Sequence, residues 1–280
     1  MRKIKTQFTI IGNPVKHSLS PAMHNAAFKK LKLPYQYHKT KLTPSQLESF
    51  FSKLKNSDYA GLNITIPYKE AVIPFLDQLS AEAELIGAVN TIQAKDNKLI
   101  GYNTDGAGYL QSLLKEKKWK TKNKKIVLLG AGGAARGILV ALCLGGAQEV
   151  IIVNRREEKT KRLLQEFKKK FPKVKMLAGS LQKLPHHFRN TDIFINTTSG
   201  GMKGNELPTL PLDALPRKAI VSDIVYKPRR TKLLKHAQKL KLKTHEGLGM
   251  LLYQGALAFE IWTGEKAPLQ VMKKVLQKNL

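Results

Sequence analysis

The stretch KKIVLLGAGGAARGILVAL, residues 124–142, decides the fold of the chain around it. Residues 125–129 predict a strand and residues 134–144 a helix, with a glycine-rich turn between them. Gly130, Gly132 and Ala135 match the pattern G-x-G-x-x-G/A, in which backbone amides approach a pyrophosphate at a helix N-terminus. A glycine turn can also simply join a strand to a helix. The flanking strand and helix favour a dinucleotide cradle formed by Gly130, Ala131, Gly132, Gly133 and Ala134.

The next predicted strand ends in NRREEK, residues 154–159, which bears on the identity of the dinucleotide. An NAD site usually has an acidic residue there, which binds the ribose 2′-hydroxyl. This chain has Asn154 followed by the cations Arg155, Arg156 and Lys159. A guanidinium binds a 2′-phosphate through paired, charge-assisted hydrogen bonds, whereas a carboxylate would repel it. The run predicts NADP; the alternative is one more exposed basic segment in a basic protein.

Strand-like and helix-like segments alternate along the rest of the chain. The other predicted strands are residues 8–11, 35–39, 60–66, 88–94, 98–102, 149–153, 192–196 and 219–223. The other predicted helices are residues 20–31, 44–55, 105–118 and 157–170, with helical stretches from 67 to about 86. Ser20 is expected to cap the helix that begins at Pro21. This alternation predicts an α/β fold with mostly parallel sheets covered by helices.

The chain closes with two predicted helices, residues 249–262 and 268–278, and no strand follows them. We expect these helices to pack back on the first domain, which would make that domain discontinuous in sequence.

The stretch GLNITIPYKE, residues 61–70, alternates apolar residues with Asn63 and Thr65. In open α/β sheets, ligands bind beyond the C-terminal ends of the strands, which is where these polar side chains are expected. Pro67 permits a helix to begin, with Lys69 in its first turn, where a cation is disfavoured. That environment suits a lysine that exchanges protons; the alternative is an ordinary surface lysine.

A carboxylate near Lys69 would hold its ammonium group in place. GYNTDG, residues 101–106, supplies a candidate in Asp105, at a predicted strand-to-helix junction. The alternative is that Asp105 only caps the helix.

Together these motifs resemble the shikimate dehydrogenase family nearly from end to end. The matching segments occur in the family's order: GNPVKHSLSPAMHN, NITIPYKE, IGAVNTI, GYNTDG, GAGGAAR, NRREEK, INTTSGG, DIVYKPRRTKLL and EGLGMLLYQGALAFEIW. Two positions depart from the family pattern, with Arg156 in place of threonine and Thr197 in place of alanine. Neither departure touches the Lys69 and Asp105 positions.

The resemblance implies an N-terminal α/β substrate domain with a mostly parallel sheet and a Rossmann-type NADP-binding domain. We expect residues 1–104 and 248–280 to form the substrate domain and residues 105–247 the NADP domain. The resemblance also implies that Ile224 and Gly247 lie against the nicotinamide, and that Asn154, Arg155 and Lys159 surround the 2′-phosphate. Arg156, which departs from the family pattern, adds a further cation to this expected cofactor site.

The same resemblance implies the substrate contacts. Ser18 and Ser20 would bind a carboxylate, and Tyr226 would lie near it. Thr65, Asn90 and Gln254 would hold ring hydroxyls, and Asp105 the hydroxyl beside the reacting carbon. The implied reaction is hydride transfer from NADPH to the ketone of 3-dehydroshikimate, with Lys69 as the proton donor and Asp105 orienting it.

Two other functions stay open at this point. One is a quinate/shikimate dehydrogenase, with NAD as an alternative cofactor; the other is a catalytically silent NADP-binding or nucleic-acid-binding protein. The presence of both Lys69 and Asp105 favours an enzyme.

Composition narrows the class of protein. The 280 residues are 42% apolar and 25% charged, as in soluble globular proteins, and carry a net charge of +29. No nucleic-acid module accompanies the lysines, which are spread along the chain, so we expect small-molecule partners rather than nucleic acid or membrane. The lone Cys143 suits a reducing compartment, and we expect a cytoplasmic monomer or homodimer. His186 and His187 lack partners at metal-ligand spacing, so we expect no metal.

Overall fold

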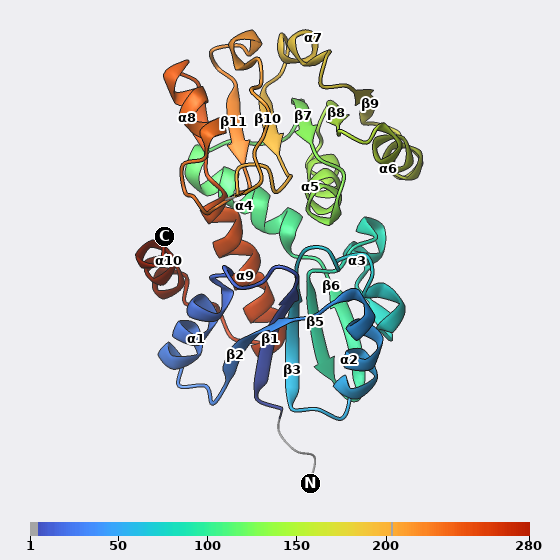
Figure 1. The fold of residues 1–280 in the computed structure, drawn as a ribbon, viewed down its shortest axis with the longest axis vertical. Coiled ribbons are helices and arrows are strands. Elements are labelled where there is room, and N and C mark those ends of the chain that lie inside the picture. The colour runs from blue at the N-terminus through green and yellow to red at the C-terminus, as the bar shows by residue number, and fades with distance from the viewer. Residues whose placement is uncertain (1–4, 203) are drawn as a thin grey trace. The chain divides into compact units, whose positions relative to one another are not determined.

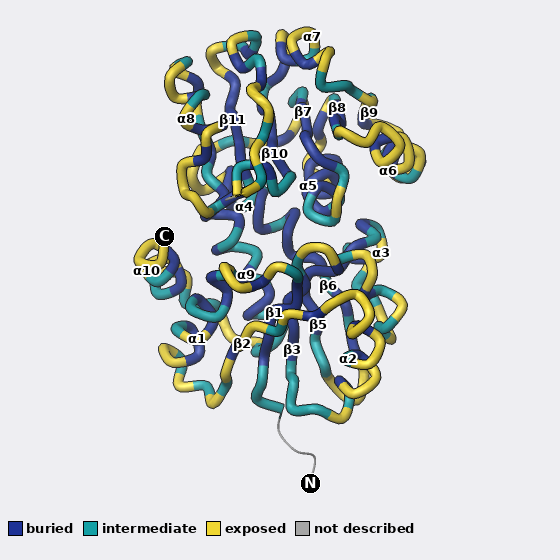
Figure 2. The backbone as a smooth tube through the Cα atoms, viewed as in Figure 1, coloured by how far each residue is buried: buried dark blue, intermediate teal, exposed yellow. Residues whose placement is uncertain are grey.

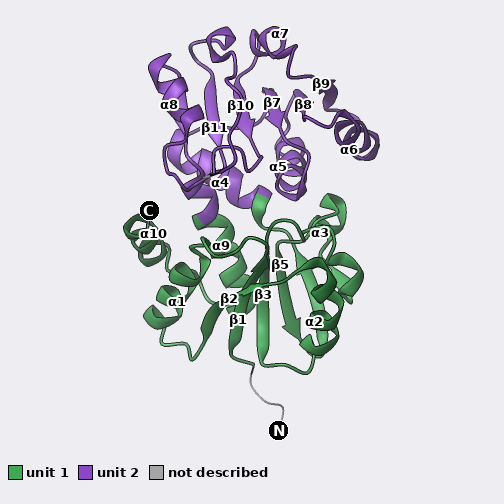
Figure 3. Cartoon of the chain, in the orientation of Figure 1, with its two compact units in different colours: residues 1–105, 252–279 green, residues 106–251, 280 purple. Residues whose placement is uncertain are grey.

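The computed structural model describes residues 5–202 and 204–280. The chain forms two compact units (Figure 3). The first comprises the described residues up to Asp105 together with Leu252–Asn279, and the second comprises Gly106–Leu251 and Leu280. The sequence predicted divisions after residues 104 and 247. The second division in the structure falls within one continuous helix, α9 (Gly247–Thr263).

The first unit is built on a six-stranded sheet in the order β2-β1-β3-β5-β6-β4. The strands are β1 (Gln7–Gly12), β2 (Gln36–Lys41), β3 (Tyr59–Ile64), β4 (Gln78–Leu79), β5 (Thr91–Lys95) and β6 (Lys98–Tyr102). β1 is parallel to β2 and β3, and β4 is parallel to β6, whereas β5 is antiparallel to both its neighbours. Asp96 and Asn97, with φ of 49° and 59°, form the tight turn between β5 and β6.

Helices cover both faces of this sheet (Figure 1). They are α1 (Ser20–Lys30), α2 (Leu47–Leu54), α3 (Ala81–Ile86), the C-terminal part of α9, and α10 (Leu269–Lys278). Phe51 of α2 and Ala83 of α3 belong to the apolar core on one face. On the other face Trp262 of α9 lies 5.0 Å from Phe8 between ring centroids, and α10 packs on α1. The C-terminal helices therefore pack back on the first sheet, as the sequence predicted.

The second unit has a sheet of six parallel strands in the order β12-β11-β10-β7-β8-β9. The strands are β7 (Lys125–Leu129), β8 (Glu149–Val153), β9 (Lys175–Gly179), β10 (Ile193–Asn196), β11 (Ile220–Asp223) and β12 (Lys243–His245). The strand order runs outward from β7 in one direction and from β10 in the other. This reversal is the switch point at which open α/β sheets bind ligands.

The helices of this unit are α4 (Asp105–Lys117), α5 (Gly133–Leu144), α6 (Glu157–Lys170), α7 (Leu184–Phe188) and α8 (Lys232–Lys239). Figure 2 shows the central strands as buried, whereas α6 and α8 alternate buried and exposed residues. Eight of the twelve residues of α5 are buried, which matches its apolar sequence. The predicted α/β class is therefore confirmed, with strands β7, β8 and β6 and helix α6 at their predicted bounds.

The prediction of a helix after Pro67 is wrong. The backbone makes turns there and then a 3-10 helix, η2 (Ile73–Phe75). A helix would need the Lys69 carbonyl to accept from the N–H of Ile73, but that carbonyl accepts from Val89 N–H at 2.7 Å. The N–H of Ile73 donates instead to the Glu70 carbonyl. Pairing with a distant segment therefore overrides the local preference for a helix.

The expected cap at Ser20 is also wrong, because Ser20 is the first residue of α1 and Leu19 occupies the capping position. The Oγ of Ser18 accepts the backbone N–H of Ser20 at 3.2 Å. Ser18 therefore satisfies one of the backbone amides that have no partner within the first turn of the helix.

Among residues 5–202 and 204–280, no helix combines the length and the apolar composition that crossing a bilayer requires.

Candidate active site

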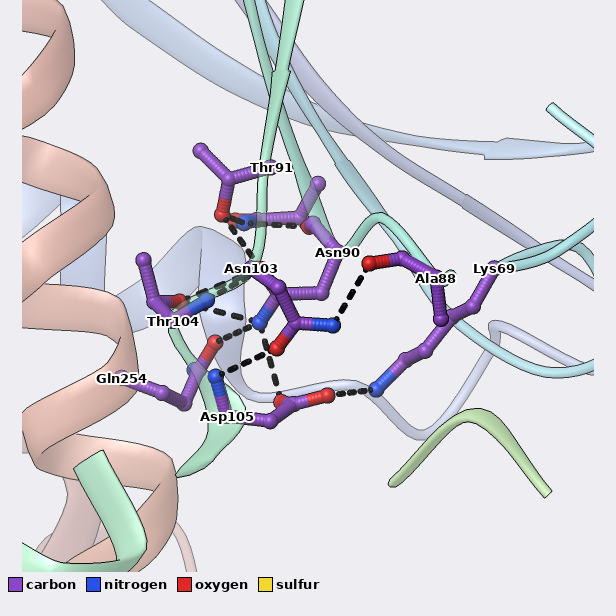
Figure 4. Close-up of polar contacts among 9 residues, drawn as sticks. Lys69, Ala88, Asn90, Thr91, Asn103, Thr104, Asp105 and Gln254 are labelled. Atoms are coloured by element: carbon purple, nitrogen blue, oxygen red, sulfur yellow. Dashed lines mark hydrogen bonds and ion pairs between the residues drawn. The ribbon is translucent and has the colours of Figure 1, made fainter. Parts of the chain in front are cut away.

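Lys69 and Asp105 are 36 positions apart in the sequence, and Nζ of Lys69 pairs with Oδ2 of Asp105 (Figure 4). Their side chains are only 14% and 5% exposed. Screening by water is weak at such sites, so the charges interact more strongly than a surface pair would. Lys69 lies in the turns that follow β3, and Asp105 begins α4 shortly after β6. The structure therefore brings together the two residues that the sequence singled out.

The Asp105 carboxylate does not cap helix α4. The backbone N–H of Asp105 donates to Oδ1 of Asn103 at 3.1 Å, and Asn103 is itself held by the Ala88 carbonyl at 2.8 Å. Asn103 thus supplies the side-chain acceptor at the start of α4. The Asp105 oxygens accept from the side chains of Lys69 and Asn90 instead.

Asn90 connects the ion pair to its surroundings. Its Nδ2 donates to Asp105 Oδ1 and to Thr104 Oγ1, each at 2.9 Å, and lies 3.4 Å from Oε1 of Gln254 (Figure 4). Asn90 is 2% exposed, so few waters compete for these bonds. Gln254 comes from α9, near the other end of the chain. Lys69, Asn90, Asp105 and Gln254 thus converge on one place in the first unit.

The remaining expected substrate residues of this unit lie at strand and helix ends. Ser18 and Ser20 stand at the start of the eleven-residue helix α1, whose N-terminus favours an anion. Thr65 follows β3, and its N–H donates to the Ile11 carbonyl at 2.9 Å. A Cβ on Gly12 would lie 2.3 Å from Cγ2 of Thr65, so β1 approaches Thr65 closely only because residue 12 is glycine.

The glycine-rich turn lies at the switch point of the second sheet, after β7. Gly130 has a φ of +119°, which side chains rarely permit. A Cβ on Gly132 would meet no atom within 4 Å, so open space adjoins the backbone there. Gly132 precedes α5 without a side-chain cap, and the first amides of a helix have no partners within it. This geometry fits an incoming pyrophosphate.

Cationic side chains follow β8 in the second unit. Arg156, Lys159 and Arg162 line a cavity of about 330 Å³ together with Glu158. Asn154 stabilises the turn before α6, since its Nδ2 donates to the Arg156 carbonyl at 3.0 Å. Arg155 is exposed but does not line that cavity. The sequence missed Arg162, although its place one helical turn after Lys159 was a usable signal.

Ile224 and Gly247 are in backbone contact within the second unit. A Cβ on Gly247 would lie 2.2 Å from the Ile224 carbonyl oxygen. Tyr226 belongs to this unit too, whereas the other six expected substrate residues belong to the first.

Asp223, at the end of β11, was also missed by sequence reasoning. Its carboxylate is fully buried and accepts from Asn196 Nδ2 (2.9 Å), Thr231 Oγ1 (2.7 Å) and the backbone N–H of Val225 (3.0 Å). Burial raises its pKa to about 6, although these three donors work in the opposite direction. Asp223 therefore anchors the segment that carries Ile224 and Tyr226.

In the described part of the chain, no three His, Cys, Asp or Glu side chains gather in a way that could hold a metal ion.

Comparison with family models matches three parts of the chain. Residues 10–92 match a shikimate dehydrogenase substrate-binding domain. Residues 112–205 match a shikimate/quinate 5-dehydrogenase model, and residues 247–277 a shikimate 5′-dehydrogenase C-terminal domain.

Whole proteins match over nearly the full length. A shikimate dehydrogenase (NADP(+)) from Methanopyrus kandleri is 44% identical over 274 residues, covering 97% of this chain and 94% of the relative. A shikimate dehydrogenase crystal structure in complex with NADP+ is 40% identical, with a TM-score of 0.89 over 98% of this chain and 95% of that one. A quinate dehydrogenase from Corynebacterium glutamicum, in complex with NAD, is 26% identical with a TM-score of 0.90 over 99% and 100%. Fold alone therefore does not separate shikimate from quinate as the substrate.

Proposed function

Because the chain belongs to the shikimate dehydrogenase family, we propose that it catalyses the reversible, NADPH-dependent reduction of 3-dehydroshikimate to shikimate. Substrate binds to the unit that contains Lys69 and Asp105, and NADP binds to the unit that contains the glycine-rich turn. The buried ion pair of Lys69 and Asp105 is the observation that carries this proposal. A lysine and an aspartate held in this way serve proton transfer better than they serve stability, because burying the two charges costs on the order of several kcal/mol per ion.

NADPH supplies the hydride to the ketone carbon when it is bound. As the carbon–oxygen double bond becomes single, negative charge grows on the oxygen. The Lys69 ammonium group donates its proton to that oxygen, and in the reverse direction the neutral amine takes the proton back. Asp105 holds Lys69 in place and accepts from the neighbouring hydroxyl. Positioned acid–base catalysis of this kind contributes about 10²–10⁴ in rate.

The expected substrate residues suit a polyhydroxylated ring acid. Thr65, Asn90 and Gln254 hold its hydroxyls through neutral donors and acceptors. Ser18 and Ser20 bind its carboxylate, supported by the electropositive start of α1. The family resemblance assigns Tyr226 of the second unit to the carboxylate as well.

Residues of the second unit fit NADP. The amides of residues 130–134 hold the pyrophosphate, supported by the open space beside Gly132. Asn154, Arg155, Arg156 and Lys159 hold the 2′-phosphate, and the cavity beside Arg156 also brings in Arg162. Ile224 and Gly247 lie against the nicotinamide. Glu158 also lines this cavity, which therefore has three cations against one acid.

A reducing, cytoplasmic location is part of the same proposal, supported by the buried, unpaired Cys143. So are small-molecule partners and a monomeric or homodimeric state.

A single assay tests the proposal against its rivals. Purified protein is given NADP⁺ or NAD⁺ with shikimate, quinate or no substrate, and reduced nicotinamide is followed by absorbance. We expect the highest kcat/KM for shikimate with NADP⁺. A preference for quinate with NAD⁺ would identify the other activity of the family, and no turnover with any pair would identify a silent binding protein.

A further inference from the structure

The side chains of Tyr37, Asn63 and Thr91 form a buried path of hydrogen bonds that leads to Asn90 and Asp105. Tyr37 Oη donates to Asn63 Oδ1 at 2.6 Å, and Asn63 Nδ2 lies 3.1 Å from Thr91 Oγ1. Thr91 Oγ1 lies 2.9 Å from Asn90 Oδ1. Asn90 Nδ2 then donates to Asp105 Oδ1 at 2.9 Å. None of these five residues is more than 4% exposed.

Two backbone groups fix the direction of every donation along this path. Asn63 Nδ2 also lies 3.1 Å from the Asn90 carbonyl, which can only accept, so the amide nitrogen of Asn63 must face that side. Its Oδ1 then faces Tyr37 and accepts the phenolic proton. Similarly, Asn90 Oδ1 lies 2.9 Å from the backbone N–H of Thr104, which can only donate. The amide nitrogen of Asn90 must therefore face Asp105.

The hydroxyl group of Thr91 joins the two amides. It accepts from Asn63, so its own proton goes to Asn90 Oδ1. Each group from Tyr37 to Asn90 thus donates toward Asp105, and Lys69 donates to the same carboxylate from the other side. Hydrogen bonds that share one direction polarise one another and strengthen together in a dry interior.

Tyr37 is the first donor of this path, and its proton and its ring orientation are both fixed. Burial raises its pKa well above the usual value, so its hydroxyl keeps its proton. The Tyr37 ring is held flat against the ring of His24, with the centroids 4.7 Å apart and the planes 7° from parallel.

We propose that Tyr37, Asn63 and Thr91 are positioning residues for the reaction, because their one-way hydrogen bonds orient Asn90 and, through it, the Asp105 carboxylate. This inference rests on the proposed roles of Lys69 and Asp105. It assigns three further residues to catalysis, none of which needs to contact the substrate. Stability alone does not require them, since apolar groups of the same shape can replace a buried hydrogen-bonded pair at little cost.

Tyr37→Phe tests the origin of the path, and Tyr68→Phe is its matched control. Both tyrosines are 2% exposed, and both hydroxyls donate at 2.6 Å, in Tyr68 to the Leu42 carbonyl. We expect the two variants to lose similar amounts of Tm. Only Tyr37→Phe should also lower kcat, by about tenfold, which corresponds to the free energy of one lost buried hydrogen bond. KM for NADP⁺ should stay unchanged in both. Wild-type kcat in Tyr37→Phe would overturn the proposal.

Thr91 provides a second test that keeps the fold intact. Thr91→Val preserves shape but removes the hydroxyl, whereas Thr91→Ser keeps the hydroxyl and loses a methyl group. We expect kcat to fall about tenfold in the valine variant and to stay near wild type in the serine variant. Equal kcat in the two variants would contradict it.

A double mutant with Asp105 distinguishes a positioning role of Tyr37 from a general loss of stability. If Tyr37 acts through Asp105, Tyr37→Phe should cause no further loss of kcat when added to Asp105→Asn. The same fold loss in both backgrounds would show that Tyr37 acts elsewhere. Failure of the proposed function would appear differently, as absence of shikimate-dependent NADP⁺ reduction in the wild-type protein itself.

Discussion

The hydroxyl group of Thr197 lies where a side chain on Gly130 would have to be. A Cβ on Gly130 would come within 2.4 Å of Thr197 Oγ1, which donates to the Leu129 carbonyl at 2.7 Å. The threonine that replaces the family's usual alanine therefore ties β10 to the end of β7 and closes on the glycine-rich turn. The turn at the switch point is shaped from two sides, by its own glycines and by the neighbouring strand.

Gly130→Ala should damage both the fold and cofactor binding. Its φ of +119° and the contact with Thr197 are each unfavourable for alanine. We expect a loss of about 3 kcal/mol in stability and little NADP⁺ binding. Gly132→Ala is the matched control, because its Cβ would meet nothing within 4 Å. That variant should keep the wild-type Tm yet bind NADP⁺ weakly by calorimetry; wild-type affinity would mean that the pyrophosphate does not approach Gly132.

Lys69→Ala should lower kcat by about 10²–10⁴ with a much smaller rise in KM, because it removes the proton donor rather than a binding group. Lys55→Ala is the control, since Lys55 also pairs with an aspartate, Asp77, at 2.6 Å in the same unit. Steady-state kinetics with shikimate and NADP⁺ measure both. Near-normal turnover in Lys69→Ala would rule out the proton-transfer role.

Removing the cationic side chains that follow β8 should weaken the binding of NADP⁺ much more than the binding of NAD⁺. Charge-assisted hydrogen bonds contribute about 1.5–3 kcal/mol, so Arg155→Ala or Arg156→Ala should raise KM for NADP⁺ about tenfold or more. Arg156 lines the cavity and Arg155 does not, so Arg156→Ala should have the larger effect. Arg217→Ala, an exposed arginine of the same unit, should leave both values unchanged. Equal losses for the two cofactors would remove the 2′-phosphate assignment.

Asp223→Asn should change how stability depends on pH. The folded pKa of Asp223, about 6, lies above its ordinary value of 3.8, so the folded state binds the proton more tightly than the unfolded state. The stability that this proton contributes is complete below about pH 4 and is lost as the pH rises to about 6. Thr231 can accept from an amide, so asparagine should fit without that loss. Relative to the variant, the wild type should lose on the order of 2 kcal/mol over this range.

Thermal denaturation of both proteins from pH 4 to pH 7 checks this prediction. Asp77→Asn is the control. A hydrogen bond from Lys55 lowers the pKa of Asp77 below its ordinary value of 3.8, so its contribution to stability is lost only as the pH falls further, and the Tm difference between wild type and Asp77→Asn should stay nearly constant from pH 4 to pH 7. A constant Tm difference between wild type and Asp223→Asn would contradict the assignment.

Strongly patterned elements were predictable from the sequence. The helix α6 (Glu157–Lys170) and the strands β7 and β8 match their predicted bounds, because each has a clear apolar period between polar turns. Two of the missed strands lack that period, whereas helix α8 was missed although its buried Leu233, Leu234 and Ala237 follow a helical spacing. In β9 (Lys175–Gly179) only Met176 is buried, and β12 is just three residues long at the sheet edge.

The candidate site was predictable in its residues but not in its connections. Lys69 and Asp105 stood out by motif, and the structure brings them together. Nothing local linked Asn63 to Tyr37, because their contact depends on β2 and β3 pairing with opposite edges of β1. The wrong helix after Pro67 has the same origin, since the Lys69 carbonyl bonds to a residue far along the chain.

The first unit is interrupted in sequence, which bears on how the protein is made. Phe8 and Phe28 leave the ribosome well before Phe259 and Trp262, which cover them. Through all of the time in which Gly106–Leu251 is translated, the nascent N-terminal sheet lacks one of its covering layers. Such an unfinished surface is prone to aggregation, so chaperone dependence during translation should concentrate in the half of the chain that is synthesised first.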